Sequence, residues 1–172
     1  MGSLLWDFSI AIYGASAVQS ECLDLQDRFG LDVNLILLCA FLGAVHRAAL
    51  TSDDIASARE AVRQWHEQIV RPLRAARRSL KTVELQGADA NGAAQLRTQV
   101  KAAELESESL ELMTLEQWAA PRLAAWPRGD CRDAIVANLQ TLLAAYGIGR
   151  ERLVAAQAMK HLIAAALDRV VN

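Results

Sequence analysis

Residues 69–83 read IVRPLRAARRSLKTV, and residues 104–116 read ELESESLELMTLE. The first stretch holds five basic residues and no acid, and the second holds five glutamates and no base. Between them lies a short segment rich in glycine and polar residues, 87–92, of the kind that interrupts helices. The pattern predicts an antiparallel helical hairpin over about residues 52–119, whose two arms carry opposite charge.

The composition of the whole chain predicts an all-α fold. The 172 residues are 53% hydrophobic, with only 9 Gly and 3 Pro, and the residues that cost least in a helix are abundant. No stretch alternates in the manner of strands. We therefore expect a single domain over residues 1–172, a bundle of about seven helices that ends in a helix pair over about 130–171.

The centre of the bundle is predicted at residues 33–49, which are apolar nearly all round. A helix without a polar face must be covered on every side. Gly30 and Asp32 just before it suit a left-handed C-cap and an N-cap.

The hairpin arms carry their own apolar patterns. The arm from 52 to 83 shows a near-heptad stripe, and Pro72 should kink it near Gln68–Arg71. The arm from 92 to 119 shows two apolar faces, which predicts two neighbours. The stripe comprises Ile55, Ala58, Val62, Trp65, Ile69, Pro72 or Leu73, Ala76, Leu80 and Val83; the two faces comprise Leu96, Val100, Ala103 and Leu110, and Leu105, Leu112 and Leu115.

The charge, the hydropathy and the cysteines limit which functions and which location are possible. A net charge of -2 argues against a general nucleic-acid binder, and the helix after Gly30 offers no side chains for reading bases, so we expect no sequence-specific nucleic-acid binding. The helix expected after Gly149 begins Arg150-Glu151-Arg152 and is only slightly better suited. The longest apolar run, 35–45, is too short to span a membrane. Three scattered cysteines and the lack of a signal peptide favour the cytoplasm.

No catalytic, metal or cofactor signature is present. A metal-carrying bundle needs Glu-x-x-His pairs, but His46, His66 and His161 follow Gly43, Arg63 and Ala158 at that spacing. We predict no catalytic residue, no metal site and no cofactor. Enzymatic activity stays open, with a non-enzymatic role favoured.

The best candidate site is a basic ridge, defined as Arg71, Arg74, Arg78 and Lys81. Counted at 100° per residue from Ile69, its three arginines point away from the apolar stripe. They could then clamp a phosphate, a carboxylate or an acidic protein partner. In the alternative, folding of the hairpin lets Glu104 and Glu108 neutralise the ridge.

A second candidate is a polar pocket of Asp32, Asn34 and His66. Capping explains Asp32. An amide in a dry bundle needs partners, so we expect Asn34 to make a structural hydrogen bond rather than a ligand contact.

Several blocks resemble a proteobacterial family of small all-helical conserved hypothetical proteins, a domain of unknown function. The most specific blocks are Gly30-Leu31-Asp32-Val33-Asn34-Leu35 and Val70-Arg71-Pro72-Leu73-Arg74, and the resemblance covers about Leu5–Trp118. It implies a bacterial cytoplasmic protein and transfers no activity.

Together these features favour a non-enzymatic binding or adaptor protein that uses the basic ridge. The alternative is an enzyme or small-ligand binder that takes an anionic compound in an inter-helix pocket. A homodimer paired through the hairpin stripes is a third possibility. A cavity of at least about 300 Å³ lined by the arginines would favour the small molecule.

Overall fold

The computed structural model describes residues 2–82, 90–149 and 159–171. Within these ranges the chain is helical, and its one β-type pairing is an isolated bridge between Ala48 and Arg128. With α4 to α5 counted as one continuous helix, the described part holds seven α-helices, which confirms the all-α prediction. The elements are α1 (Leu4–Tyr13), α2 (Ser16–Phe29), α3 (Val33–Val45), α4 (Ser52–Trp65), the π-helix η1 (His66–Val70), α5 (Arg71–Thr82), α6 (Ala90–Ala119), the 3-10 turn η2 (Ala120–Arg122), α7 (Cys131–Ala145) and α9 (Lys160–Val171).

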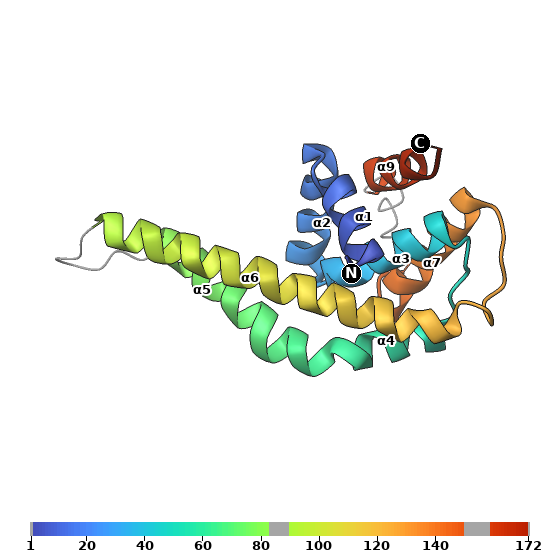
Figure 1. The fold of residues 1–172 in the computed structure, drawn as a ribbon, viewed down its shortest axis with the longest axis horizontal. Coiled ribbons are helices and arrows are strands. Elements are labelled where there is room, and N and C mark those ends of the chain that lie inside the picture. Colours follow the sequence, from blue (N-terminus) through green and yellow to red (C-terminus); the bar gives the residue numbers. More distant parts are fainter. Residues whose placement is uncertain (1, 83–89, 150–158, 172) are drawn as a thin grey trace.

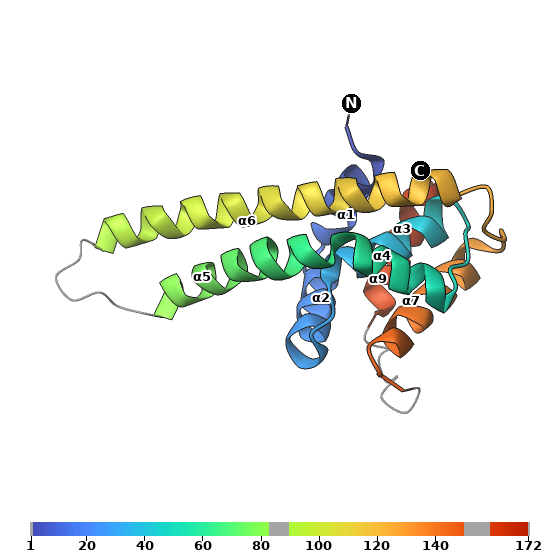
Figure 2. The same cartoon turned by 90° about the horizontal axis from the view of Figure 1, so that it is seen from below.

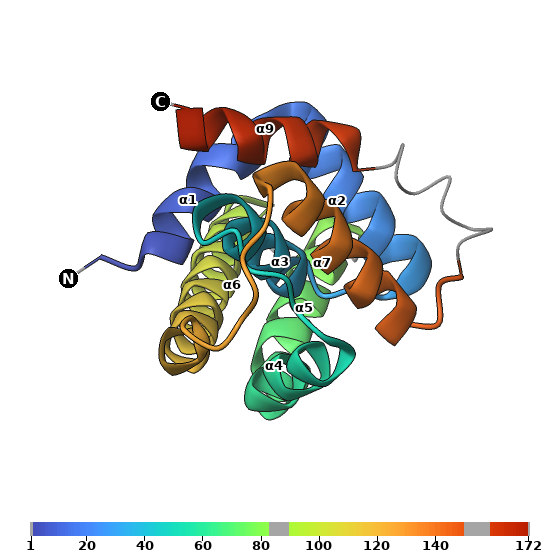
Figure 3. The same ribbon diagram turned by 90° about the vertical axis from the view of Figure 1, so that its right-hand side faces the viewer.

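Helix α3 lies at the centre, as its apolar sequence predicts. Seen from the end of the molecule in Figure 3, the other helices surround it. Every residue from Val33 to Ala44 is buried. The closest neighbour is α7: a Cβ on Gly43 would stand 2.6 Å from the backbone of Ile135, so only glycine permits this approach.

The turn into α3 follows the predicted cap chemistry. Gly30 ends α2 in the left-handed conformation with φ 67°, and the Asp32 carboxylate accepts the backbone N–H of Asn34 at 2.9 Å. Gly30 and Asp32 thus fix where α3 starts, and this start lies next to the hairpin.

The hairpin, which consists of α4 to α5 and α6, extends well beyond the other helices (Figures 1 and 2). Helix α6 is 30 residues long and runs beside α4, η1 and α5. The near ends of both hairpin arms pack on the other helices, α1, α2, α3, α7 and α9, which we call the body. The far ends of α5 and α6 contact mainly each other. The predicted Gly-rich loop and Val83, and the predicted start of the last helix at Arg150-Glu151-Arg152, lie outside the described residues.

The irregularity predicted at Pro72 takes the form of a π-turn just before it. The backbone N–H of Arg71 donates to the carbonyl of His66, five residues earlier. This adds one residue to the turn and rotates the following residues by about 100° relative to a regular α-helix. The apolar stripe is therefore wrong at its middle: Ile69 is 38% exposed, whereas Val70 is fully buried.

The two apolar faces expected on α6 are also partly wrong. Leu112 and Leu115 are buried, but Leu96, Leu105 and Leu110 are exposed. The face that packs on the body carries three buried polar residues instead, Glu104, Ser107 and Glu111. Two glutamates of the acidic block, Glu104 and Glu111, are therefore buried rather than exposed.

Two further findings bear on the sequence analysis. No helix of the described residues is long and apolar enough to cross a membrane. Cys22, Cys39 and Cys131 are all free thiols, and the first two are buried.

Candidate functional site

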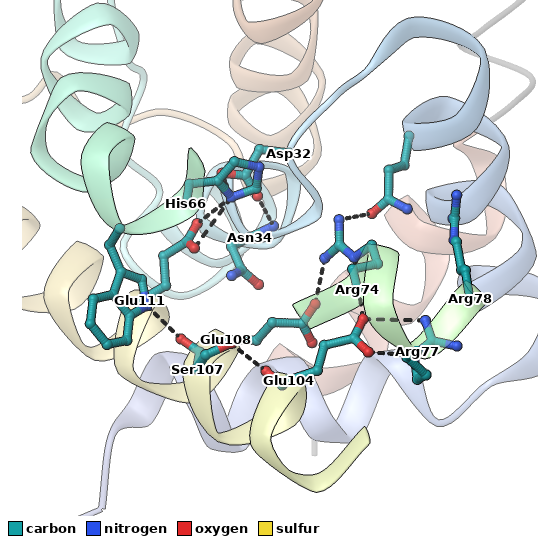
Figure 4. A network of polar contacts seen from close by, with 12 residues as sticks. Asp32, Asn34, His66, Arg74, Arg77, Arg78, Glu104, Ser107, Glu108 and Glu111 are labelled. Atoms are coloured by element: carbon teal, nitrogen blue, oxygen red, sulfur yellow. Dashed lines mark hydrogen bonds and ion pairs between the residues drawn. The ribbon is translucent and has the colours of Figure 1, made fainter. Parts of the chain in front are cut away.

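Three ionisable side chains meet where the hairpin packs against the start of α3. We call them the buried triad: Asp32, His66 and Glu111. Asp32 precedes α3, His66 is the first residue of the π-turn, and Glu111 lies on α6 (Figure 4). The Nδ1 atom of His66 lies 3.2 Å from the Asp32 carboxylate and 3.2 Å from that of Glu111. One ring nitrogen therefore faces two acids.

Burial shifts the pKa values of Asp32 and His66. It raises the pKa of Asp32 to about 7, and the charge of Glu111 raises it further than His66 lowers it. For His66, burial lowers the pKa, but the hydrogen bond to Glu111 and the charges of both acids outweigh it, so the net pKa is raised. Asp32 therefore titrates near neutral pH beside an imidazole whose pKa is raised, and this is the range where general acids and bases operate.

The same three groups are also of the types that bind divalent metal ions. Each offers one ligand atom, and the three atoms lie within 4.8 Å of one another. The sequence analysis missed this set of possible metal ligands because it tested only for a local Glu-x-x-His pair. The three residues lie far apart in the sequence. Glu111 was visible only as one member of the acidic block.

Beside the triad, a second network joins the two arms of the hairpin. Arg74 pairs with Glu104 at 3.3 Å and with Glu108, and it also donates to Gln26 of α2. Arg77 pairs with the same Glu104. The alternative in which the two glutamates neutralise the ridge is thus confirmed for Arg74.

The outward direction predicted for Arg74 is wrong, since its side chain is 14% exposed. The count began at Ile69, which lies within the π-turn and is exposed. Counted from buried Val70, Arg74 stands about 40° away and faces the body. Arg78 pairs with exposed Asp27, while Arg71 and Lys81 are exposed and have no ion-pair partner among the described residues.

Part of the basic ridge and part of the buried triad line one cavity of about 470 Å³. Five arginines contribute to its wall, together with Asp32 and His66. In the same lining, the guanidinium carbon of Arg59 lies 4.5 Å from the centroid of the Tyr146 ring. Burial, and then the charge of Asp32, raise the pKa of Tyr146. The arginines are Arg59, Arg63, Arg71, Arg74 and Arg78, of which the sequence analysis missed the first two.

Asn34 does not make the structural hydrogen bond expected of its side chain. It is buried, and its Nδ2 atom has no partner within the described residues, although its backbone N–H bonds to Asp32. In Figure 4 it lies between the triad and the Arg74 network, and it lines a different cavity from Asp32 and His66. Of the predicted polar pocket, Asp32 and His66 are therefore together, and Asn34 faces elsewhere.

Comparison with known proteins assigns a family without an activity. The model of a family described as "Protein of unknown function (DUF2390)" matches residues 4–115, more than half of the chain. This match spans α1 to most of α6 and includes all three residues of the triad. No curated protein and no solved structure matches the chain. The chain belongs to the DUF2390 family of proteins of unknown function.

Proposed function

We propose that this protein binds a small anionic molecule in the arginine-lined cavity, with Asp32 and His66 as proton-exchanging groups in its wall. The observation that carries the proposal is the cavity itself: about 470 Å³, with five arginines and two members of the buried triad in one lining. Its volume is within the usual range for small-molecule sites.

Two of the arginines are available for a ligand. Arg63 pairs with Glu60 and Glu67, Arg78 with Asp27, and Arg74 with the hairpin glutamates. Arg59 and Arg71 have no ion-pair partner among the residues described. We assign them the first contacts with the anion.

The chemistry of guanidinium favours a phosphate or carboxylate group, because its planar fork donates two parallel hydrogen bonds to such groups. The rest of the ligand would lie toward His66 and Asp32. A proton there could neutralise the bound anion or pass to it, so the site suits either a binding protein or an enzyme of acid–base type. This is the small-ligand alternative raised by the sequence, now preferred to the adaptor.

Calorimetric titration with inorganic sulfate tests the proposal, since the charge of sulfate does not change near neutral pH. Replacing both available arginines, R59Q/R71Q, should weaken binding at least about tenfold, as expected for charge-assisted hydrogen bonds. The control R97Q/K81Q removes the same charge from exposed positions outside the cavity lining and should bind like the parent. Equal loss in both variants would reduce the site to non-specific charge attraction.

The adaptor remains a second candidate, favoured by the exposure of Arg71 and Lys81 on an arm that extends from the body. The exposed leucines on α6 could likewise form the contact surface of a homodimer; they are Leu96, Leu105 and Leu110. If R97Q/K81Q loses a specific captured protein while sulfate binding stays intact, the arm has an adaptor role. The free cysteines suit a reducing compartment, so we propose the cytoplasm as the location.

A further inference from the structure

A second cavity lies on the other side of Arg74, among α1, α2, α3, α5 and α6, with a volume of about 340 Å³. Arg74 and Gln26 line both cavities and so form the wall between them. The character of this second cavity differs from the first. Much of its lining is apolar or aromatic, including Trp6, Ile10, Leu23 and Leu105.

Two polar groups in its lining have no partner. Ser9 is 3% exposed and Asn34 is 5% exposed, yet Ser9 Oγ and Asn34 Nδ2 make no hydrogen bond. They are the two buried side-chain polar atoms in this condition within residues 2–82, 90–149 and 159–171, and both line this cavity.

Other hydroxyl and amide side chains of the fold do have partners. Thr98, Thr114 and Thr141 all bond to the carbonyl four residues earlier in their helices. Buried Asn138 donates to the carbonyls of Cys39 and Ala48 and accepts from Leu50. A buried polar group without a partner destabilises the fold, so two of them at one cavity indicate an occupant that bonds to both.

Water alone is a poor occupant. One water takes up roughly 30 Å³ in the liquid, so a cluster of waters would be needed to fill the cavity. Filling it with water would also leave Ile10, Leu23 and Leu105 hydrated, and these are among the most exposed large apolar side chains. An apolar body with a polar end fits the lining better.

We infer that this cavity binds a small neutral amphipathic molecule that presents a carbonyl oxygen to Ser9 and Asn34. The amide of Asn34 and the hydroxyl of Ser9 are both donors, and a carbonyl oxygen can accept two hydrogen bonds. The lining carries charges of both signs, but Arg74 and Arg77 already pair with Glu104 and Glu108, and Lys101 is exposed. The two buried donors are therefore matched by a neutral carbonyl group. This site is separate from the proposed anion site and does not depend on it.

Acetophenone and ethylbenzene are suitable probes, because they have nearly the same shape and only the first carries a carbonyl. In ¹H–¹⁵N spectra of the whole chain, acetophenone should shift the side-chain NH₂ signals of Asn34 saturably. Ethylbenzene should bind about 2–10-fold more weakly, in line with the net value of one hydrogen bond. R59Q/R71Q should leave acetophenone binding unchanged, which separates this inference from the anion site.

Ser9→Ala gives the sharpest test, because ligand binding and stability should move in opposite directions. It should weaken acetophenone about 2–10-fold while the melting temperature stays equal or rises, since an unsatisfied hydroxyl is removed. Ser107→Ala is the control: its hydroxyl bonds to the Glu104 carbonyl and lies outside the cavity lining, so the melting temperature should fall and binding should not change. No saturable shift of Asn34, equal binding of both probes, or a Ser9→Ala variant that melts earlier with unchanged acetophenone affinity would overturn the inference.

Discussion

The carboxylate of Asp32 lies 3.2 Å from Nδ1 of His66, while its other oxygen caps α3 through the N–H of Asn34. One side chain thus starts the central helix and joins a buried titrating group. Because Glu111 approaches the same imidazole, the cap, the π-turn and the acidic arm meet at one point. Stability and ligand binding should therefore both depend on protons held here.

Stability should fall as the pH rises from about 5 to 8. The pKa of Asp32 is raised from 3.8 to about 7, so over that interval the folded chain keeps a proton that the unfolded chain has released. The raised pKa of His66 acts in the same direction above its ordinary value of 6.5. The effect should be on the order of a few kcal/mol at most, because one pKa unit corresponds to about 1.4 kcal/mol. Urea unfolding across this pH range measures it.

Asp32→Asn distinguishes the titration of Asp32 from its role as the N-cap of α3. Asparagine caps helices as well as aspartate does but does not titrate. The stability of this variant should be flatter with pH than that of the parent. Asp32→Ala should lie a further 0.5–2 kcal/mol or so below Asp32→Asn at every pH, through loss of the cap. Parallel pH curves for parent and Asp32→Asn would show that Asp32 does not titrate in this range.

Sulfate binding should weaken several-fold between pH 6 and pH 8. A dianion beside Asp32 and His66 favours their protonated forms, so binding takes up protons and affinity falls as the pH rises. Calorimetry in buffers of different ionisation enthalpy would count the protons directly. With Asp32→Asn the proton uptake should drop, and an unchanged uptake would place the titrating group elsewhere.

Arg74 and Arg71 should behave very differently although they share one helix. Arg74→Gln removes the ion-pair partner of Glu108 and one of the two arginines that pair with Glu104. The glutamate side chains are 25% and 7% exposed, so the loss should cost about 3–5 kcal/mol. Arg71→Gln changes an exposed residue and should stay within about 0.5 kcal/mol of the parent. Adding Glu108→Gln to Arg74→Gln should restore part of the loss. Similar urea midpoints for the two single variants would contradict the described network.

Leu38→Ala should be among the most damaging substitutions, at about 2–5 kcal/mol, because Leu38 is fully buried in α3. Leu110→Ala is a matched control on the exposed face of α6 and should cost far less. A loss under about 1 kcal/mol for Leu38→Ala would remove α3 from the centre of the bundle.

Local patterns in the sequence were enough to predict α3 and its turn. Gly30 and Asp32 act through their own backbone and nearest neighbours, and an all-apolar helix has one way to be stable. The hairpin was predictable for a similar reason, because its arms differ in charge over long stretches. None of these features depends on distant contacts.

The site was harder to predict, because it depends on register and on contacts between elements. The π-turn at His66–Val70 rotates α5, so a regular helical count gave Arg74 the wrong direction. The buried triad brings together residues 32, 66 and 111, and no local spacing connects them. Asn34 was expected to be satisfied as most buried amides are, and its free Nδ2 became visible only with the cavity beside it.

The most direct measurement of the central claim is the response of individual arginines to sulfate. In ¹H–¹⁵N spectra, the Nε–Hε signals of Arg59 and Arg71 should shift saturably with one dissociation constant, while that of exposed Arg97 on the arm stays still. The same titration of Arg71→Gln should leave Arg59 with a weaker response. A uniform drift of all arginine signals, or shifts concentrated on Arg97, would contradict an anion site in this cavity.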